Sequence, residues 1–212
     1  MKIFSWVPFF LTLVVAQDNN LFFSEYAEGS GNNKYLEIYN GTGSDVDLSN
    51  YAIARYNNGS STDESLYPLS GSLTNGEVYV IANSQADPTG ILPFNDDDGS
   101  SMTVTYYNGD DYLGLIQDSD NNGVFDNSSE VIDVIGVLGE DPGSGWDVAG
   151  TSAATAEHTL VRKSTITSGN INWSASAGNT ADNSEWIVLA QNTWDYIDSH
   201  PHPELESTDT AI

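Results

Sequence analysis

The chain has 212 residues, 31 acidic against five basic side chains, and a formal net charge of −26 at pH 7. This length allows one domain with a sizeable core, and the charge argues against nucleic-acid binding, which needs clustered Lys and Arg. There is no cysteine, which excludes disulfides, thiol nucleophiles and Cys-ligated metal sites.

Residues 1–16 have the pattern of a secretory signal peptide. Lys2 precedes an apolar run over residues 3–15, and small residues occupy the cleavage positions before Gln17. The run is short for a membrane span, although an uncleaved anchor is the alternative. We therefore expect a secreted chain, extracellular or at the cell surface, without stable membrane insertion. Cleavage removes Lys2 and no acid, so the mature net charge is −27.

From residue 20 onward, short runs rich in Val, Ile, Tyr and Trp alternate with turn clusters. Leu36 and Ile38 alternate with more polar neighbours, which predicts a strand with one buried face. Further strands are predicted over residues 77–82, 102–107, 112–116, 131–137, 159–162 and 186–189. The only helical signal is a turn near 147–157.

Many short strands with frequent turns are typical of a sandwich or barrel. We see no linker, so the sequence predicts one β domain over residues 17–198. A flexible tail is expected over residues 199–212, where prolines interrupt the pattern.

Several segments together resemble the lamin tail domain family, in the form found on secreted bacterial proteins. They are LFFSEYAEGSGNNKYLEIYNGTGSDVDLSNYAIARY (21–56), SLTNGEVYVIAN (72–83), VTYYNGDDYLGLI (104–116) and VIDVIGV (131–137), with the closing segments 159–170 and 179–188. The resemblance implies an all-β, immunoglobulin-like β-sandwich and a binding or scaffolding role. The NGDD segment resembles a hairpin of that family, and the insert 118–130 is the main departure from it.

The insert, DSDNNGVFDNSSE, matches the spacing Asp-x-Asp-x-Asn-Gly-x-x-Asp of calcium-binding loops. Such a loop supplies oxygen ligands at alternating positions, with Gly123 at the bend. The twelfth position, Glu in an EF-hand, is Ser129 here. The candidate Ca2+ ligands are Asp118, Asp120, Asn122, Val124 (through its carbonyl), Asp126 and Glu130. The alternative is a solvated acidic hairpin tip.

Two further acidic clusters, residues 96–98 and 110–111, either add metal ligands or are solvated loops. No Gly-x-Ser-x-Gly motif accompanies the three histidines, His158, His200 and His202, so a hydrolytic triad is not indicated. We expect no enzymatic activity.

Trp146 and Trp173 lie in loop-like segments, where an exposed ring could stack on a sugar or a protein partner. Packing in the core or anchoring of a loop is the alternative for both. Four glycosylation sequons begin at Asn40, Asn58, Asn127 and Asn172, each in a predicted surface turn.

The leading hypothesis is a secreted, non-catalytic module that binds an extracellular protein or glycan and is stabilised by Ca2+. A second is a self-assembling subunit of an extracellular fibre or sheath, in which the strand over residues 20–26 is donated to a neighbouring copy. A third is an accessory domain that escorts a hydrolase.

Overall fold

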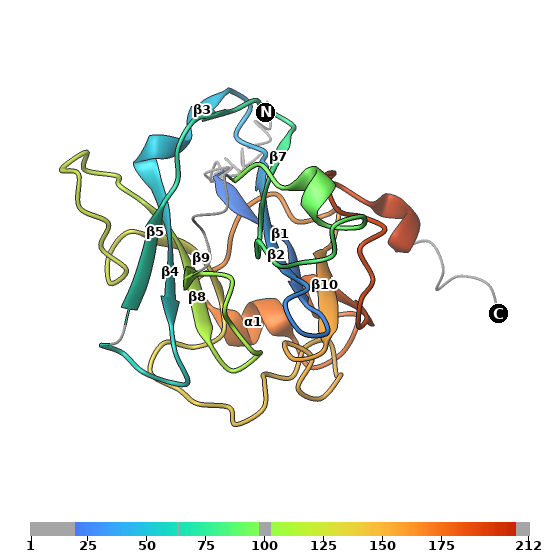
Figure 1. Cartoon of the computed structure of the whole chain (residues 1–212). Helices are drawn as coiled ribbons and strands as arrows, with labels where there is room; N and C mark the ends of the chain where they lie inside the picture. Colours follow the sequence, from blue (N-terminus) through green and yellow to red (C-terminus); the bar gives the residue numbers. More distant parts are fainter. Residues whose placement is uncertain (1–19, 63, 98–102, 207–212) are drawn as a thin grey trace, which may run out of the picture.

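The structure is a computed structural model that describes residues 20–62, 64–97 and 103–206. The predicted signal peptide and residues 207–212 lie outside this part. Two antiparallel sheets face each other as a β-sandwich (Figure 1). The five-stranded sheet has the order β11 (Trp186–Ala190), β10 (His158–Arg162), β1 (Leu21–Glu28), β2 (Lys34–Asn40), β7 (Val78–Ala82).

The second sheet has the order β5 (Glu64–Pro68), β4 (Tyr51–Tyr56), β8 (Tyr112–Gln117), β9 (Val131–Ile135). A small third sheet pairs β3 (Val46–Asp47) with β6 (Ser72–Leu73). The short helices are η1 (Leu48–Asn50), η2 (Leu92–Phe94), α1 (Trp173–Ala177) and η4 (Pro203–Leu205). Within the described ranges, none of the helices has the length and apolar character that crossing a bilayer requires.

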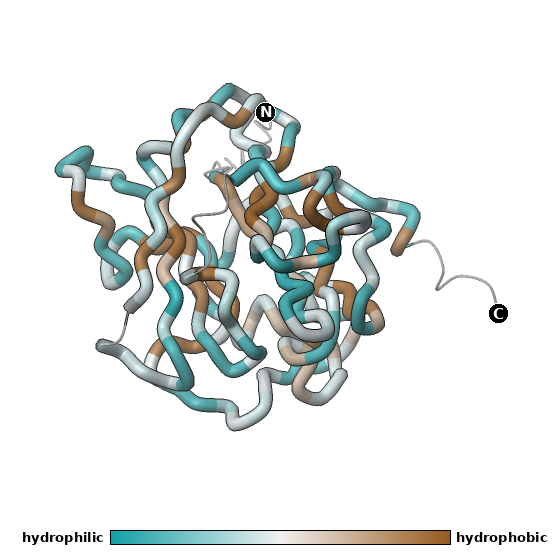
Figure 2. Tube along the Cα trace, viewed as in Figure 1, coloured by the Kyte–Doolittle hydropathy of each residue, from teal (hydrophilic) through white to brown (hydrophobic). Residues whose placement is uncertain are grey.

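The main core fills the space between the two large sheets. Leu36 and Ile38 of β2 meet Ile53 of β4 and Leu115 of β8 there, and all four are fully buried. Figure 2 shows hydrophobic stretches along the strands and hydrophilic stretches along many of the loops. The predicted immunoglobulin-like β-sandwich is therefore confirmed.

A second, smaller core covers the outer face of the five-stranded sheet. Tyr35, Val80 and Ile197 belong to it, with Trp194 packed against its edge. The prediction that β2 has one buried face is wrong, because Tyr35 and Glu37 on its other face are also fully buried. Both faces of β2 are buried because segments that do not belong to the sheet pack over its outer face.

Part of that cover is the C-terminal segment 191–206, which we call the strap. The expectation of a flexible tail from residue 199 does not describe residues 199–206. His200 and His202 are each 8% exposed, and the His200 ring packs edge-on against Phe22 at 5.5 Å between centroids. Glu206 accepts a hydrogen bond from the Ser164 amide at 2.6 Å. Aromatic packing and hydrogen bonds to the rest of the chain therefore fix this segment, in spite of its two prolines.

Five of the six further strand predictions correspond to strands, namely β7, β8, β9, β10 and β11. The strand predicted over 102–107 is wrong for residues 103–107, which form turns and loop. Tyr107 is fully buried and donates its hydroxyl to the carbonyl of Ala27 at 2.8 Å or of Tyr35 at 2.7 Å. Val104 and Tyr107 of this segment therefore pack in the main core without forming a strand. Consequently, the NGDD segment is not a two-strand hairpin.

Helix α1 lies at residues 173–177 and not near 147–157, where the structure has turns. Asn172 caps the helix by accepting a hydrogen bond from the Ala175 amide at 3.2 Å. The sequence signal for this start was the Asn cap itself, which a five-residue helix makes easy to overlook.

One buried arginine joins the two sheets. Arg162 of β10 pairs with Asp133 of β9, and both side chains are fully buried. Its guanidinium also bonds Glu185 at 2.7 Å and stacks over the Trp186 ring at 4.0 Å. The Phe23 carbonyl accepts from its Nε at 3.1 Å. A charge that is buried this completely needs such a full set of partners.

Candidate metal centre

The insert 118–130 joins β8 to β9, two adjacent strands of the second sheet. Its two ends are tied to the sandwich, since the Asp118 amide donates to the Asn50 carbonyl at 2.8 Å and the Gln117 amide donates to the Glu130 carbonyl at 3.1 Å. The ends of the loop are therefore anchored by backbone hydrogen bonds.

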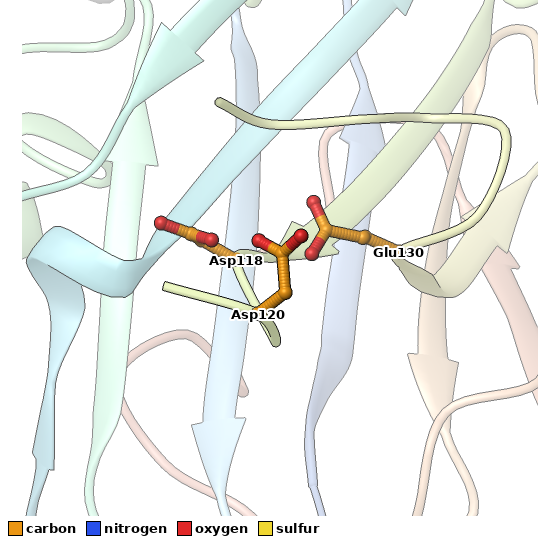
Figure 3. A group of neighbouring side chains, drawn as sticks. All are labelled: Asp118, Asp120 and Glu130. Carbon is orange, nitrogen blue, oxygen red and sulfur yellow. The ribbon is translucent and has the colours of Figure 1, made fainter. Parts of the chain in front are cut away.

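Three carboxylates converge where the insert leaves the sheet. Asp118, Asp120 and Glu130 each offer an oxygen, and these oxygens all lie within 4.8 Å of one another. Figure 3 shows the three side chains next to one another, with the carboxylate of Asp120 between those of Asp118 and Glu130 in this view. Calcium binds oxygens at about 2.3–2.6 Å, so ligands on opposite sides of one ion lie about 5 Å apart. The spacing therefore fits ligands around a single ion.

Backbone amides shape this cluster. Asp118 accepts from the amides of Asn122 at 3.0 Å and Gly123 at 2.9 Å, which folds the chain back over its carboxylate. Gly123 has φ +76° with no atom near the place of a Cβ, so glycine is used here for its backbone conformation. The carboxylates are thus held in place by the turn that the motif predicts.

Glu130 is held from both sides of the loop. Its carboxylate accepts from the Ser119 amide at 2.8 Å and from the Asp126 amide at 3.1 Å. The hydrogen bond from the Asp126 backbone is the main cause that lowers the pKa of Glu130. Glu130, one position late for an EF-hand, therefore belongs to the cluster, and these hydrogen bonds favour its ionised form.

Of the four predicted carboxylate ligands, Asp126 does not belong to this cluster. Asn122 lies beside it, donating its amide group to Asp120 at 2.9 Å. The Asp126 carboxylate bonds the hydroxyls of Ser128 at 2.6 Å and Ser129 at 2.9 Å instead, and the Ser128 hydroxyl is the main cause that lowers its pKa. The Val124 side chain is 61% exposed.

Three acids of the two other clusters have structural contacts. Asp111 forms an ion pair with Arg55 at 3.0 Å and accepts from the Asn58 amide at 2.9 Å. Asp96 accepts from the Val80 amide at 2.8 Å, which covers the free edge of β7. Asp97 bonds the Tyr67 hydroxyl, and Asp98 lies outside the described residues.

The two candidate tryptophans, Trp146 and Trp173, differ in exposure. Trp173 is 3% exposed and packs between Trp146 and Trp186, with ring centroids 6.5 and 6.4 Å away. Trp146 is half-buried and lines, with Asp147 and Asn183, a groove of about 530 Å³. Of the two rings, Trp146 is the one available to a ligand.

The four sequon asparagines also differ in exposure, which corrects the expectation that each lies at the surface. Asn40 is fully buried, with its amide donating to the carbonyls of Ser44 and Leu73, and Asn127 is 7% exposed. Asn58 and Asn172 are exposed. Only the latter two could carry a glycan in this fold.

Comparison with known proteins supports the fold. The sequence profile described as Lamin Tail Domain matches residues 15–139. A solved structure of a DUF4876 family protein from Bacteroides thetaiotaomicron is similar, with a TM-score of 0.50 and 11% identity over 87% of this chain and 75% of that one. At this identity the likeness concerns the fold alone. No curated protein matches the sequence.

Proposed function

Since the chain belongs to the lamin tail domain family, we propose that it is a secreted, non-catalytic module that binds an extracellular protein or glycan and is stabilised by Ca2+. The observation that carries the calcium part is the convergence of Asp118, Asp120 and Glu130 at the base of an insert between two core strands. The signal-peptide pattern of residues 1–16 supports secretion.

Oxygen chemistry and charge support a hard divalent cation at this cluster. Each of the three carboxylates brings an oxygen to one place, and no nitrogen or sulfur ligand is among them, which suits a cation that prefers oxygen. The net charge of −26 also favours uptake of cations over anions. A bound ion would tie the start of the insert to its end through Asp118 and Glu130.

The groove beside Trp146 is the place where this module would bind its partner. An indole face with polar neighbours such as Asp147 and Asn183 suits a sugar ring or an aromatic side chain. The net charge favours a neutral or cationic partner, because an anionic one would be repelled.

The calcium part is tested by thermal unfolding of the chain from Gln17 onward, in chelator and in millimolar CaCl2. A ligand that binds only the folded state adds about 2.7 kcal/mol at a hundredfold excess over its dissociation constant. We expect calcium to raise the melting temperature of the wild type and Asp120→Asn to lose that rise. Asp182→Asn is the matched control, because Asp182 is exposed and lies outside the insert.

An equal calcium response in Asp120→Asn and the wild type would show that the ion binds elsewhere. No response in either protein would leave the cluster as a solvated acidic turn. Light scattering under the same conditions tests the fibre alternative, since growth to large ordered species in calcium would favour a self-assembling subunit over a binding module.

Strand donation over residues 20–26 is not supported as the means of such assembly. These residues contribute to β1, which lies inside the sheet and pairs with both β10 and β2. Donating it would open the protein's own core.

A further inference from the structure

Two glutamates face each other across the β1–β2 pair. Glu25 and Glu37 are register partners, and both are fully buried on the outer side of the five-stranded sheet. An irregularity between Phe23 and Glu25 places Glu25 there, because Phe23 and Tyr26 both point into the main core. Two residues three positions apart share a face of a strand only where a bulge intervenes.

Apolar residues flank this pair along the sheet. Val161 of β10 is opposite Glu25, and Val80 of β7 is opposite Glu37. Both valines are fully buried. The row of side chains that crosses the sheet at this level therefore brings no positive charge to either carboxyl group.

The hydrogen bonds around the pair are few and uncharged. Glu25 accepts from the Tyr35 hydroxyl at 2.6 Å through one oxygen, while its other oxygen is buried without a partner. Glu37 accepts from the Ser24 hydroxyl at 2.7 Å and from the Asp198 amide at 2.7 Å. The last bond connects the pair directly to the strap.

The remaining titratable groups nearby do not neutralise the pair. Asp198 faces Glu37 from the strap, and Asp96 lies near Asp198 in the segment over β7; both are acids. His200 is buried above Phe22, and burial lowers its pKa to about 4, so it is neutral near pH 7. Arg162 is engaged by Asp133 and Glu185 toward the main core.

Burying two carboxylates without a counter-charge costs free energy, and this cost falls when the pair holds a proton. Burial raises the pKa of Glu37 to about 8. Burial, and then the charge of Glu37, raises the pKa of Glu25 well above its ordinary value. A protonated Glu37 can donate its hydroxyl to the Ser24 oxygen and still accept from the Asp198 amide. The two groups titrate as a unit.

We propose that Glu25 and Glu37 form a proton-operated latch, which holds the strap against the outer face of the five-stranded sheet and loosens it when the pair ionises. Besides the bond to Asp198, the strap contributes Ile197 to the second core, where it packs with Tyr35 and Val80. Ionisation of the pair places negative charge beneath these contacts and weakens them. The latch is independent of the proposed calcium site and of the binding function.

The sign of the effect follows from linkage. The unfolded chain loses the proton of Glu37 near its ordinary pKa of 4.5, whereas the folded chain holds it to about pH 8. The stability from the protonated pair is therefore complete below pH 4.5 and is lost as the pH rises through 8. The unfolding equilibrium constant should rise on the order of a thousandfold across this window.

The test compares the wild type with Glu37→Gln, a neutral isostere of the protonated side chain, in urea unfolding from pH 4 to pH 9 with a chelator present. We expect the variant to lose most of the pH dependence and to exceed the wild type in stability at pH 9. In hydrogen exchange at pH 9, peptides from the strap should exchange faster in the wild type than in Glu37→Gln. Glu25→Gln is the second variant, should the first fail to fold.

Glu77→Gln is the matched control, because it removes one exposed carboxylate from the same sheet region and tests the general effect of charge. An equal change of slope in Glu77→Gln and Glu37→Gln would overturn the latch. So would strap exchange at pH 9 that is the same in all variants. If millimolar Ca2+ restores wild-type stability at pH 9 and Glu37→Gln abolishes that effect, the pair holds a cation and the proton latch is wrong.

Discussion

The partners of single buried charges show how this chain tolerates ionic groups in its interior. The guanidinium of Arg162 bonds the carboxylates of Asp133, which is fully buried, and Glu185. Its remaining bonds go to the Phe23 carbonyl and the Ser176 hydroxyl, and the Trp186 ring lies over its plane. Breaking a buried pair by removing one partner costs about 3–5 kcal/mol, because the other charge stays behind. Among the residues that the structure describes, Arg162 is the one base with no exposed surface.

Replacing Arg162 with Met should therefore lower the free energy of unfolding by about 3–5 kcal/mol. Urea unfolding at neutral pH measures the change. Lys163→Met is the matched control, because Lys163 is its partly exposed neighbour and donates to the Ala181 carbonyl; we expect it to cost under about 1 kcal/mol. A similar small cost for both variants would contradict the structural role of Arg162.

At the scale of elements, one segment shows how side-chain bonding replaces a predicted strand. Residues 103–107 have the composition of a strand, yet their backbone pairs with no sheet. Tyr107 instead reaches the carbonyls of Ala27 and Tyr35, at the turn that joins β1 to β2. A side-chain hydrogen bond thus connects this segment to the sheet in place of backbone pairing.

We expect Tyr107→Phe to destabilise the protein by about 1–2 kcal/mol, because a buried carbonyl group loses its donor. Thermal or urea unfolding measures this loss. Tyr106→Phe removes the same hydroxyl from the adjacent ring, which is 47% exposed, and should be nearly neutral. A Tyr106→Phe effect as large as that of Tyr107→Phe would show that the buried hydroxyl has no special role.

At the scale of the whole molecule, charge is the dominant property. A net charge of −26 on 212 residues opposes the compact state through self-repulsion. Screening shortens the range of this repulsion, from about 10 Å at 0.1 M salt to about 3 Å at 1 M. The folded state therefore gains from salt, whatever the ion at the insert.

The melting temperature should accordingly rise by several degrees between low and molar NaCl, measured by calorimetry in the presence of chelator. The chelator separates this screening from any effect of calcium, and Asp120→Asn should show the same rise as the wild type. A melting temperature that stays constant or falls with salt would mean that self-repulsion does not limit stability.

The sequence by itself determined the fold class and most of the strands. Short β-branched and aromatic runs with turn residues between them are local signals, and β1, β2, β7, β8 and β10 follow them closely. The calcium-loop spacing pointed to Asp118 and Asp120, two of the three carboxylates that converge, because a turn around Gly123 is encoded within a few residues. Glu130 lies outside that spacing, and the fold brings it to the other two.

Only the tertiary structure decided what covers the outer sheet face and which acids are buried. Glu25 and Glu37 look like solvent-facing residues in sequence, since nothing local tells that residues 191–206 return to lie over them. The same holds for Tyr107, whose partners are more than 70 residues away. Burial and long-range pairing depend on the whole chain folding together, whereas turns and strand periodicity depend on neighbours in sequence.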